Sequence, residues 1–225
     1  MNKEKYNLFS RFLSRSRELT QENQKEQLLP SIEHLRSHAF NKRGRKSIKQ
    51  ATKLHLGCGA NIMDGWLNSD LVLTDSVPQE LWERIPSIFI MDATETFPFP
   101  DNKFEFIYCE DFLEHFDQKD GLSIFAECFR VLKPNGVWRL STPNFDWILS
   151  HLDFSTHESI DFGHWNWGHK LIYSEKYALS CLEAVGFSVR KCKYAESEHK
   201  VLKEIDSRAD QKYLNLIMEA TKPQS

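Results

Sequence analysis

Two glycines follow the first apolar run of the main body of the chain and could bring a ligand against the backbone. Gly57 and Gly59 come directly after residues 53–56, in the stretch LHLGCG. Because glycine has no Cβ, the turn can be tight and can leave room for a ligand beside it. The dinucleotide fingerprint GxGxxG is incomplete, since Ile62 stands in place of the third glycine. No Gly-Lys-Ser/Thr sequence follows, so the turn is not a P-loop. A purely structural turn is the alternative.

Two aspartates follow at places where a nucleoside needs polar partners. Asp70 ends the stretch GWLNSD, and a carboxylate at a strand end can accept hydrogen bonds from both ribose hydroxyls. Asp92 ends the next apolar run, and its carboxylate with the N–H of Ala93 suits the edge of an adenine ring. No basic residue stands at the glycine turn to bind a phosphate. The set therefore favours a nucleoside without phosphates over NAD or ATP.

Three histidines are candidate catalytic residues, since a positioned base can take the proton of a hydroxyl or amine. His115 lies just past the run 104–109, close to the predicted nucleoside site, where the alternative is that it packs against the sheet. His164 and His169 lie in DFGHWNWGHK, residues 161–170, which could cover the site and contact an acceptor or could form a packed lid. A His-x4-His spacing can bind metal, but the sequence shows no third ligand, so we predict no metal.

Strands and helices alternate along the part of the chain that must position these residues. The predicted strands are 53–56, 66–69, 87–91, 104–109, 137–140, 187–194 and 213–221. The predicted helices are 122–132, 145–152 and a helix capped by Ser174 that runs to Val185 and stops at Gly186. This alternation predicts a Rossmann-like, doubly wound α/β sheet. Right-handed crossovers would bring the loops after the strands to one crevice.

The first fifty residues differ in charge from the rest. Residues 1–50 hold 12 Lys/Arg against 5 Asp/Glu, whereas the remainder holds 17 against 27. Helical spacing over residues 6–40 predicts two amphipathic helices that pack on the domain or on a second subunit, as in a homodimer. We therefore divide the chain into a basic helical arm and linker at 1–50 and a catalytic domain at 51–225. The arm is a solvated extension or a contact for RNA, anionic lipid or an acidic partner.

Composition narrows the location and class of the protein. The five cysteines are odd in number and never form a CxxC pair, which argues against a disulfide framework and a structural zinc. We expect reduced cysteines in a cytoplasmic protein. No apolar run reaches the length of a membrane span, and the first residues lack the pattern of a secretory signal.

Taken together, the motifs resemble those of the class I S-adenosylmethionine-dependent methyltransferases, in particular the small type 11 group. The matching segments are LHLGCG (54–59), GWLNSD (65–70), MDATETFPFPDNKFEFIYCEDFLEHF (91–116), ECFRVLKPNGVWRLSTPN (127–144) and EAVGF (183–187). The resemblance implies a seven-stranded, mostly parallel sheet with an antiparallel last strand, and S-adenosylmethionine as the cofactor. It also implies which part of the cofactor each site residue contacts. The methionine part would lie against Gly57, Cys58, Gly59 and Glu110. The ribose would contact Asp70, and the adenine would contact Asp92 and Ala93.

The sequence departs from the broad family pattern around the first glycine turn. His55 stands where an acidic residue is usual, and Asn61 stands where a third glycine is usual. The gap from Gly59 to Asp70 is also short for a helical crossover. We therefore expect the first crossover helix to be one turn or absent.

These inferences predict methyl transfer from S-adenosylmethionine to a small molecule or a sugar of a glycan. Alignment of the reactants alone can lower the barrier by roughly 7–11 kcal/mol, so a general base is optional. One alternative is an RNA or protein methyltransferase that holds its target with the basic arm. Another is a cofactor-binding scaffold subunit without catalysis.

Overall fold

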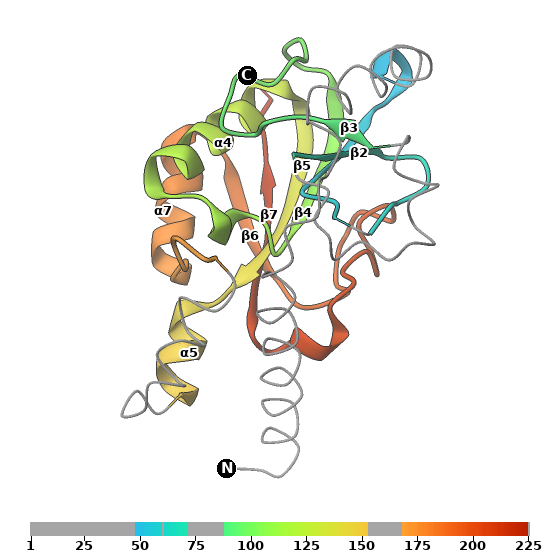
Figure 1. The fold of residues 1–225 in the computed structure, drawn as a ribbon. Helices are drawn as coiled ribbons and strands as arrows, with labels where there is room; N and C mark the ends of the chain where they lie inside the picture. The colour runs from blue at the N-terminus through green and yellow to red at the C-terminus, as the bar shows by residue number, and fades with distance from the viewer. Residues whose placement is uncertain (1–47, 60, 72–87, 153–167, 225) are drawn as a thin grey trace, which may run out of the picture.

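Seven strands form one sheet at the centre of the molecule (Figure 1). The strands are β1 (Lys53–Leu56), β2 (Leu67–Asp70), β3 (Phe89–Ile90), β4 (Phe104–Glu110), β5 (Leu132–Pro143), β6 (Ser188–Cys192) and β7 (Asn215–Thr221). Their order across the sheet is β3-β2-β1-β4-β5-β7-β6. This computed structural model describes residues 48–59, 61–71, 88–152 and 168–224. Nearly all of the predicted arm at 1–50 lies outside those ranges.

Strand direction places the ends of five strands at one edge of the sheet. Strands β1 to β5 are parallel, while β7 runs antiparallel to both β5 and β6. The chain leaves β1 in one direction along the sheet and reaches β4 on its other side, so strand order reverses between these neighbours. Ligands of open α/β sheets bind at such a reversal, beyond the carboxyl ends of the strands. The predicted Rossmann-like class and the antiparallel last strand are confirmed.

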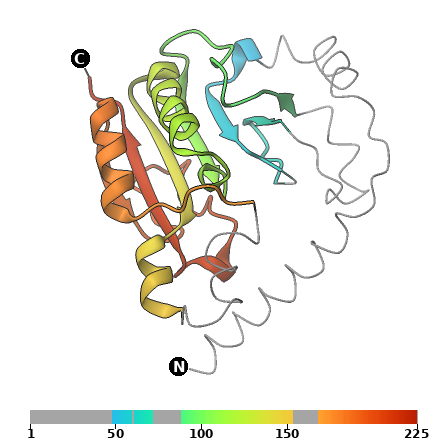
Figure 2. The ribbon, with the colours of Figure 1, turned by 60° about the vertical axis from the view of Figure 1, so that its left-hand side comes forward.

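Two helices cover one face of the sheet (Figure 2). They are α4 (Gln118–Val131) and α7 (Glu175–Val185). The Ser174 hydroxyl accepts a hydrogen bond from Tyr177 N, and Gly186 ends α7 in the left-handed conformation, as predicted. Helix α4 begins earlier than predicted, because the Asp117 side chain caps it by accepting from Asp120 N.

The core lies between these helices and the sheet. From α4, Phe125 packs against Trp138 of β5, with ring centroids 5.3 Å apart. Trp138 also lies against Phe187, the residue that precedes β6. Both Phe125 and Trp138 are buried. Burial of such large aromatic surfaces is the main stabilising term for the layer.

Strand β5 is much longer than the predicted 137–140. It includes Pro134, Asn135 and Gly136, which the sequence suggested as a turn. Asn135 N donates to Lys222 O at 2.8 Å, and Lys222 N donates to Gly136 O at 3.0 Å. Pairing with the segment that follows β7 therefore extends the strand through a sequence whose local preference is a turn.

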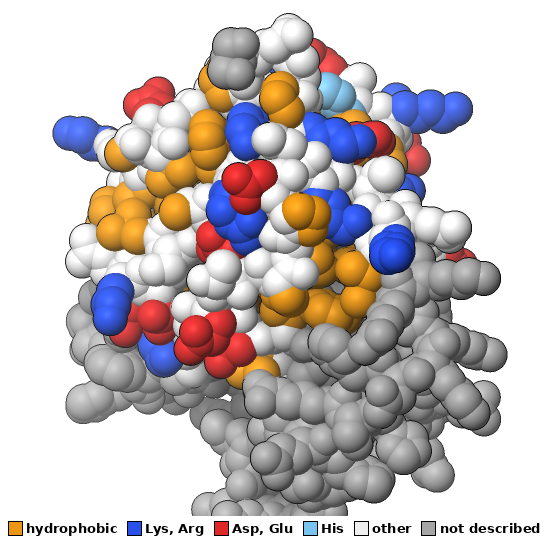
Figure 3. Space-filling view, turned by 90° about the horizontal axis from the view of Figure 1, so that it is seen from above, with side chains coloured by type: hydrophobic (Ala, Val, Ile, Leu, Met, Phe, Trp, Pro, Cys, Tyr) orange, Lys and Arg blue, Asp and Glu red, His pale blue; other side chains and the backbone are white. Residues whose placement is uncertain are grey.

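The remaining described elements are short. Helix α5 (Phe145–His151) follows β5, and the 3-10 helices η2 (Leu113–His115) and η4 (Ala209–Gln211) follow β4 and precede β7. Seen from above, the molecule shows acidic and basic side chains interspersed with apolar ones (Figure 3). Within the described ranges, no helix combines the length and apolar character that crossing a bilayer requires.

Candidate functional site

The two glycines after β1 perform different tasks. Both adopt positive φ, +62° at Gly57 and +47° at Gly59. A Cβ added to Gly57 would lie 2.1 Å from Phe112 Cδ2, so a side chain there would collide with the ring. A Cβ added to Gly59 would meet no heavy atom within 4 Å among the described residues. Gly57 thus permits close packing, whereas Gly59 lies beside open space that a ligand could fill.

Asp70, the last residue of β2, is tied to the glycine turn. Its Oδ2 accepts a hydrogen bond from Gly59 N at 2.8 Å. The backbone of Cys58 is also joined to β2, because Cys58 N donates to Ser69 O at 3.0 Å. The short crossover therefore brings a carboxylate against the open turn. Between Asn61 and Trp66 the chain forms turns and no helix, as the short gap predicted.

A buried histidine and an asparagine hold this short crossover. The Asn68 side chain accepts from Met63 N at 2.9 Å and donates to the carbonyls of Met63 and Trp66. His55 Nδ1 lies 3.1 Å from Asn68 Oδ1. Burial lowers the pKa of His55 to about 4, against a smaller raising effect of the bond to Asn68. His55 is therefore a neutral residue at neutral pH. The sequence marks His55 as unusual for the family but does not reveal Asn68 as its partner.

Asp92 follows β3 and orders its own turn. Its Oδ1 accepts from Thr94 N at 2.9 Å and from Thr94 Oγ1 at 2.7 Å. Ala93 between them is buried. The carboxylate and the N–H of Ala93 are thus placed in a fixed turn at the same edge as Asp70. Contact with an adenine stays a prediction.

Glu110, at the end of β4, binds a loop from a distant part of the chain. Its carboxylate accepts from the hydroxyl and N–H of Ser207 and from Arg208 N. Burial raises the pKa of Glu110, while the bonds from Ser207 lower it. The predicted cofactor residue thus also fixes the loop between β6 and β7 at this edge.

A buried ion cluster holds that same loop, and no sequence motif indicates it. Arg139 of β5 is fully buried and donates to both carboxylate oxygens of Asp206, at 2.8 and 2.6 Å. It also donates to Glu219 of β7 at 2.8 Å. A charge pattern alone cannot reveal such a cluster, because its members are far apart in the chain.

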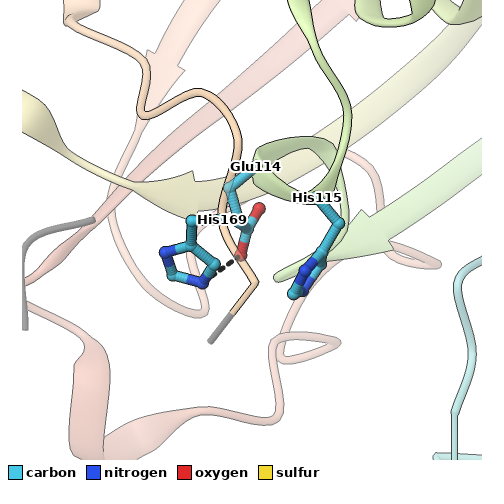
Figure 4. Close-up of side chains that lie close together, drawn as sticks. All are labelled: Glu114, His115 and His169. Atoms are coloured by element: carbon cyan, nitrogen blue, oxygen red, sulfur yellow. Dashed lines mark ion pairs between the residues drawn. The ribbon is translucent and has the colours of Figure 1, made fainter. Parts of the chain in front are cut away.

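Glu114, His115 and His169 come together beside the ends of β4 and β5 (Figure 4). The possible ligand atoms of the three side chains all lie within 4.8 Å of one another. Glu114 Oε1 is 4.0 Å from His169 Nε2, and Glu114 Oε2 accepts from Thr142 Oγ1 at 3.0 Å. The sequence offered no third ligand to accompany His164 and His169. The structure provides Glu114 and His115 beside His169, while His164 lies outside the described residues.

Backbone bonds explain how residues far apart in sequence meet here. The carbonyl of Glu114 accepts from Lys170 N at 2.7 Å and from Leu171 N at 3.2 Å. Burial raises the pKa of the Glu114 carboxyl well above its ordinary value, and the nearby charge of Asp111 adds to this. Burial also lowers the pKa of His115, although the carbonyl of Gly168 opposes the shift. The available sequence signal was the neighbouring pair Glu114-His115, of which only the histidine was a candidate site residue.

The fold and this edge have the features that the resemblance to class I methyltransferases implied. They are the mostly parallel seven-stranded sheet with its antiparallel last strand, the glycine turn after β1, and the acids at the end of β2 and after β3. Residues 54–140 match the family model described as "Methyltransferase domain", in the type 11 group. The resemblance is therefore confirmed for this part of the chain, and it supports S-adenosylmethionine as the cofactor.

Individual relatives of the chain are also named as methyltransferases. The chain is 30% identical over 102 residues to the probable methyltransferase PMT19 of Arabidopsis thaliana, covering 41% of this chain and 16% of that protein. It is 33% identical over 95 residues to the sterol 24-C-methyltransferase of Yarrowia lipolytica, covering 40% of this chain and 23% of that protein. The chain therefore spans less than a quarter of each of these two relatives.

A solved structure shares the fold over most of the chain. It is a SAM-dependent methyltransferase from Archaeoglobus fulgidus, with a TM-score of 0.52 at 17% identity, covering 85% of this chain and 95% of that one. At this identity the likeness concerns the fold alone. The open space beside Gly59 and the carboxylate bound to its N–H are the features of this structure that fit the cofactor.

Proposed function

We propose that this chain transfers a methyl group from S-adenosylmethionine to an acceptor held at the carboxyl edge of the sheet. When bound, S-adenosylmethionine supplies a methyl group attached to a positively charged sulfur. The observation that carries the proposal is the bond from Gly59 N to Asp70, beside open space at the turn. It places a backbone surface and a ribose acceptor side by side.

We propose that different residues of this edge contact different parts of the cofactor. Gly57, Cys58 and Gly59 lie along the methionine part, and Asp70 accepts from the ribose hydroxyls. The turn at Asp92 and Ala93 holds the adenine, because it offers a carboxylate and an N–H at a fixed place. Glu110 lies beside the methionine part and holds Ser207 and Arg208 in position there.

The acceptor side of the site is the group of His115 and His169, with His164 as a further candidate. We infer a small molecule or a glycan sugar as the acceptor, with the histidines contacting its polar groups. The five cysteines are all free thiols, which supports the expected cytoplasmic location. A basic arm that holds RNA or protein remains the second candidate, supported by the charge of residues 1–50.

Calorimetry with S-adenosylmethionine and its demethylated product tests the cofactor half of the proposal. We expect micromolar dissociation constants for the purified chain. The Asp70→Ala variant should bind about 1–3 kcal/mol more weakly, because ribose hydroxyls lose their acceptor. Absence of heat and of a thermal shift at millimolar ligand would refute cofactor binding.

Two further variants separate contact from folding. Asp70→Asn keeps an oxygen that can accept from Gly59 N, so the turn should persist while the charge is lost. Glu95→Ala removes an exposed carboxylate two positions beyond the Ala93 turn and should leave affinity unchanged. Equal affinities for Asp70→Ala and Glu95→Ala would remove Asp70 from the site.

Turnover is tested by a screen of candidate acceptors with labelled cofactor. Sugars and small hydroxylated or amino compounds form one set, and RNA and protein form the other. Labelling of RNA that is lost at high salt would favour the second candidate function, since phosphate contacts are strongly salt-dependent. Cofactor binding without labelling of any acceptor would favour the scaffold alternative.

A further inference from the structure

We propose that Glu114, His115 and His169 bind one divalent transition-metal ion, with Zn²⁺ as the expected occupant. The three side chains offer two imidazole nitrogens and one carboxylate oxygen (Figure 4). This donor set suits Zn²⁺ and other first-row divalent ions, and it leaves coordination positions open. The inference goes beyond methyl transfer, because the ion can bind whether or not the chain is an enzyme.

The spacing of the donor atoms is close to what a single ion requires. All three possible ligand atoms lie within 4.8 Å of one another. Ligands at about 2.0–2.2 Å from one zinc ion lie roughly 3–3.5 Å apart. Closure therefore needs shifts of roughly 1 Å, which small rotations of the side chains can supply.

The environment of Glu114 is the second observation that indicates a cation. Its side chain is fully buried, and Oε1 has no hydrogen-bond partner among the described residues. The nearest basic atom, His169 Nε2, is 4.0 Å from Oε1, which is too long for a hydrogen bond. A buried carboxylate is costly unless it is paired or binds a metal. An ion between Glu114 and the two histidines would offset this cost.

The surrounding contacts hold the donors as outer partners do in metal sites. Thr142 Oγ1 donates to Glu114 Oε2 and so leaves Oε1 directed toward His169. The bonds from Lys170 N and Leu171 N to the Glu114 carbonyl fix the chain next to His169. Such partners orient ligands and strengthen metal binding.

If the methyltransferase proposal also holds, the ion would define the chemistry of the acceptor. Three protein ligands leave room for an oxygen of the acceptor at the same edge as Asp70 and Glu110. A bound ion lowers the pKa of a coordinated hydroxyl, which can then release its proton to water. This consequence rests on the proposed function and favours a hydroxylated acceptor, such as a sugar, over an amine.

Metal titration of the full chain tests the site without any methyl transfer. The chain is stripped with a chelator, then titrated with Zn²⁺ by calorimetry and with Co²⁺ by visible absorption. We expect one saturable ion per chain and ligand-field absorption bands from bound Co²⁺. His169→Ala should weaken Zn²⁺ binding by about 100-fold or more. His151→Ala, which removes an exposed histidine outside the group, should leave the affinity unchanged.

Two more variants keep the test decisive if a ligand variant folds poorly. Glu114→Gln retains the size of the side chain and an oxygen for Thr142, yet should lose most of the affinity. Thr142→Val should lower the affinity by about 10-fold, as expected for an outer partner. Near-UV circular dichroism reports whether each variant is folded.

Three results would overturn the site. They are no saturable binding by the wild type, equal losses in His169→Ala and His151→Ala, and full affinity in folded Glu114→Gln. Calorimetry with S-adenosylmethionine on the same wild-type sample separates the two proposals. Cofactor binding without zinc binding refutes the metal site alone, whereas zinc binding without cofactor binding refutes the proposed function alone.

Discussion

The two halves of the carboxyl edge are built in different ways. In the β1–β3 half, the contacts join residues close in sequence: Gly59 with Asp70, 11 positions apart, and His55 with Asn68, 13 apart. In the β4–β5 half, Glu110 binds Ser207, 97 positions away, and Arg139 binds Asp206, 67 away. The β1–β3 half is held by contacts across short loops, whereas the β4–β5 half is held by contacts between segments that are far apart in the chain.

This difference has a thermodynamic consequence. Closing a longer loop costs more conformational entropy, so long-range contacts must be strong or buried to persist. The β4–β5 half meets this need with a buried arginine between two carboxylates. The β1–β3 half meets its smaller need with backbone bonds, the Asp70 carboxylate on Gly59 N, and the side chains of His55 and Asn68. Substitutions in the two halves should therefore lower stability by different amounts and with different dependence on pH.

The largest effect should come from breaking the ion cluster of the β4–β5 half. Arg139→Met leaves Asp206 buried without its cation and leaves Glu219 with Arg190 alone, so the free energy of unfolding should fall by about 3–5 kcal/mol. Urea unfolding measures it. Arg190→Met is the matched control, since Arg190 also pairs with Glu219 but is 36% exposed. It should cost about 1 kcal/mol or less. Similar losses in the two variants would show that the buried cluster is not the anchor.

The next largest effect should come from the glycine turn of the β1–β3 half. Gly57→Ala adds left-handed backbone strain and a collision with Phe112, so the free energy of unfolding should fall by about 2–4 kcal/mol. Gly59→Ala adds the strain in open space and should cost about 1–2 kcal/mol. Urea unfolding of both variants gives the difference, and a larger loss in Gly59→Ala would contradict the distinct tasks of the two glycines.

The stability contributed by the β1–β3 half should depend on pH because of His55. Its folded pKa of about 4 lies below the ordinary value of 6.5, so the unfolded chain takes up the proton first as pH falls. The stabilisation is complete above about pH 6.5 and is lost between pH 6.5 and 4, by up to about 3 kcal/mol. Unfolding curves of the wild type and His55→Gln measure it. Their difference in stability should change across this window, and a constant difference would contradict the prediction.

The smallest effect should come from one surface contact of the β4–β5 half. Ser207→Ala removes a hydroxyl that donates to Glu110 but keeps the backbone donors of Ser207 and Arg208. The free energy of unfolding should fall by about 1 kcal/mol or less, because Ser207 is exposed. Thermal unfolding beside the control Ser180→Ala, a serine on the surface of α7, measures the loss. A loss above about 2 kcal/mol would mean that the side chain, rather than the backbone, holds the loop.

Local sequence signals predicted the elements that local interactions form. Ser174 and Gly186 bounded α7 correctly, because caps satisfy backbone groups within one turn. The short gap between Gly59 and Asp70 correctly indicated a crossover with at most one helical turn, since residues 61–66 form no helix. Strand β5 was predicted too short, since backbone bonds to Lys222, just after β7, extend it through Pro134-Asn135-Gly136.

The group of Glu114, His115 and His169 was predicted less completely. His115 and His169 were chosen from the sequence, yet their relation to each other and to Glu114 was not visible there. The expectation of no metal rested on His164 and His169 alone, and His169 in fact lies beside a different pair. The role of Arg139 could not be predicted, because the sequence around a single arginine in an apolar strand does not show which residues it contacts.

The sequence by itself determined the class of fold, the glycine turn and the acids that follow the first strands. Those features depend on strand and turn preferences and on contacts within about a dozen residues, which the order of the amino acids specifies directly. Only the tertiary structure decided which side chains meet beyond β4 and β5. That grouping depends on strand order and on segments that return from far along the chain, where burial and charge pairing, rather than local preference, select the partners.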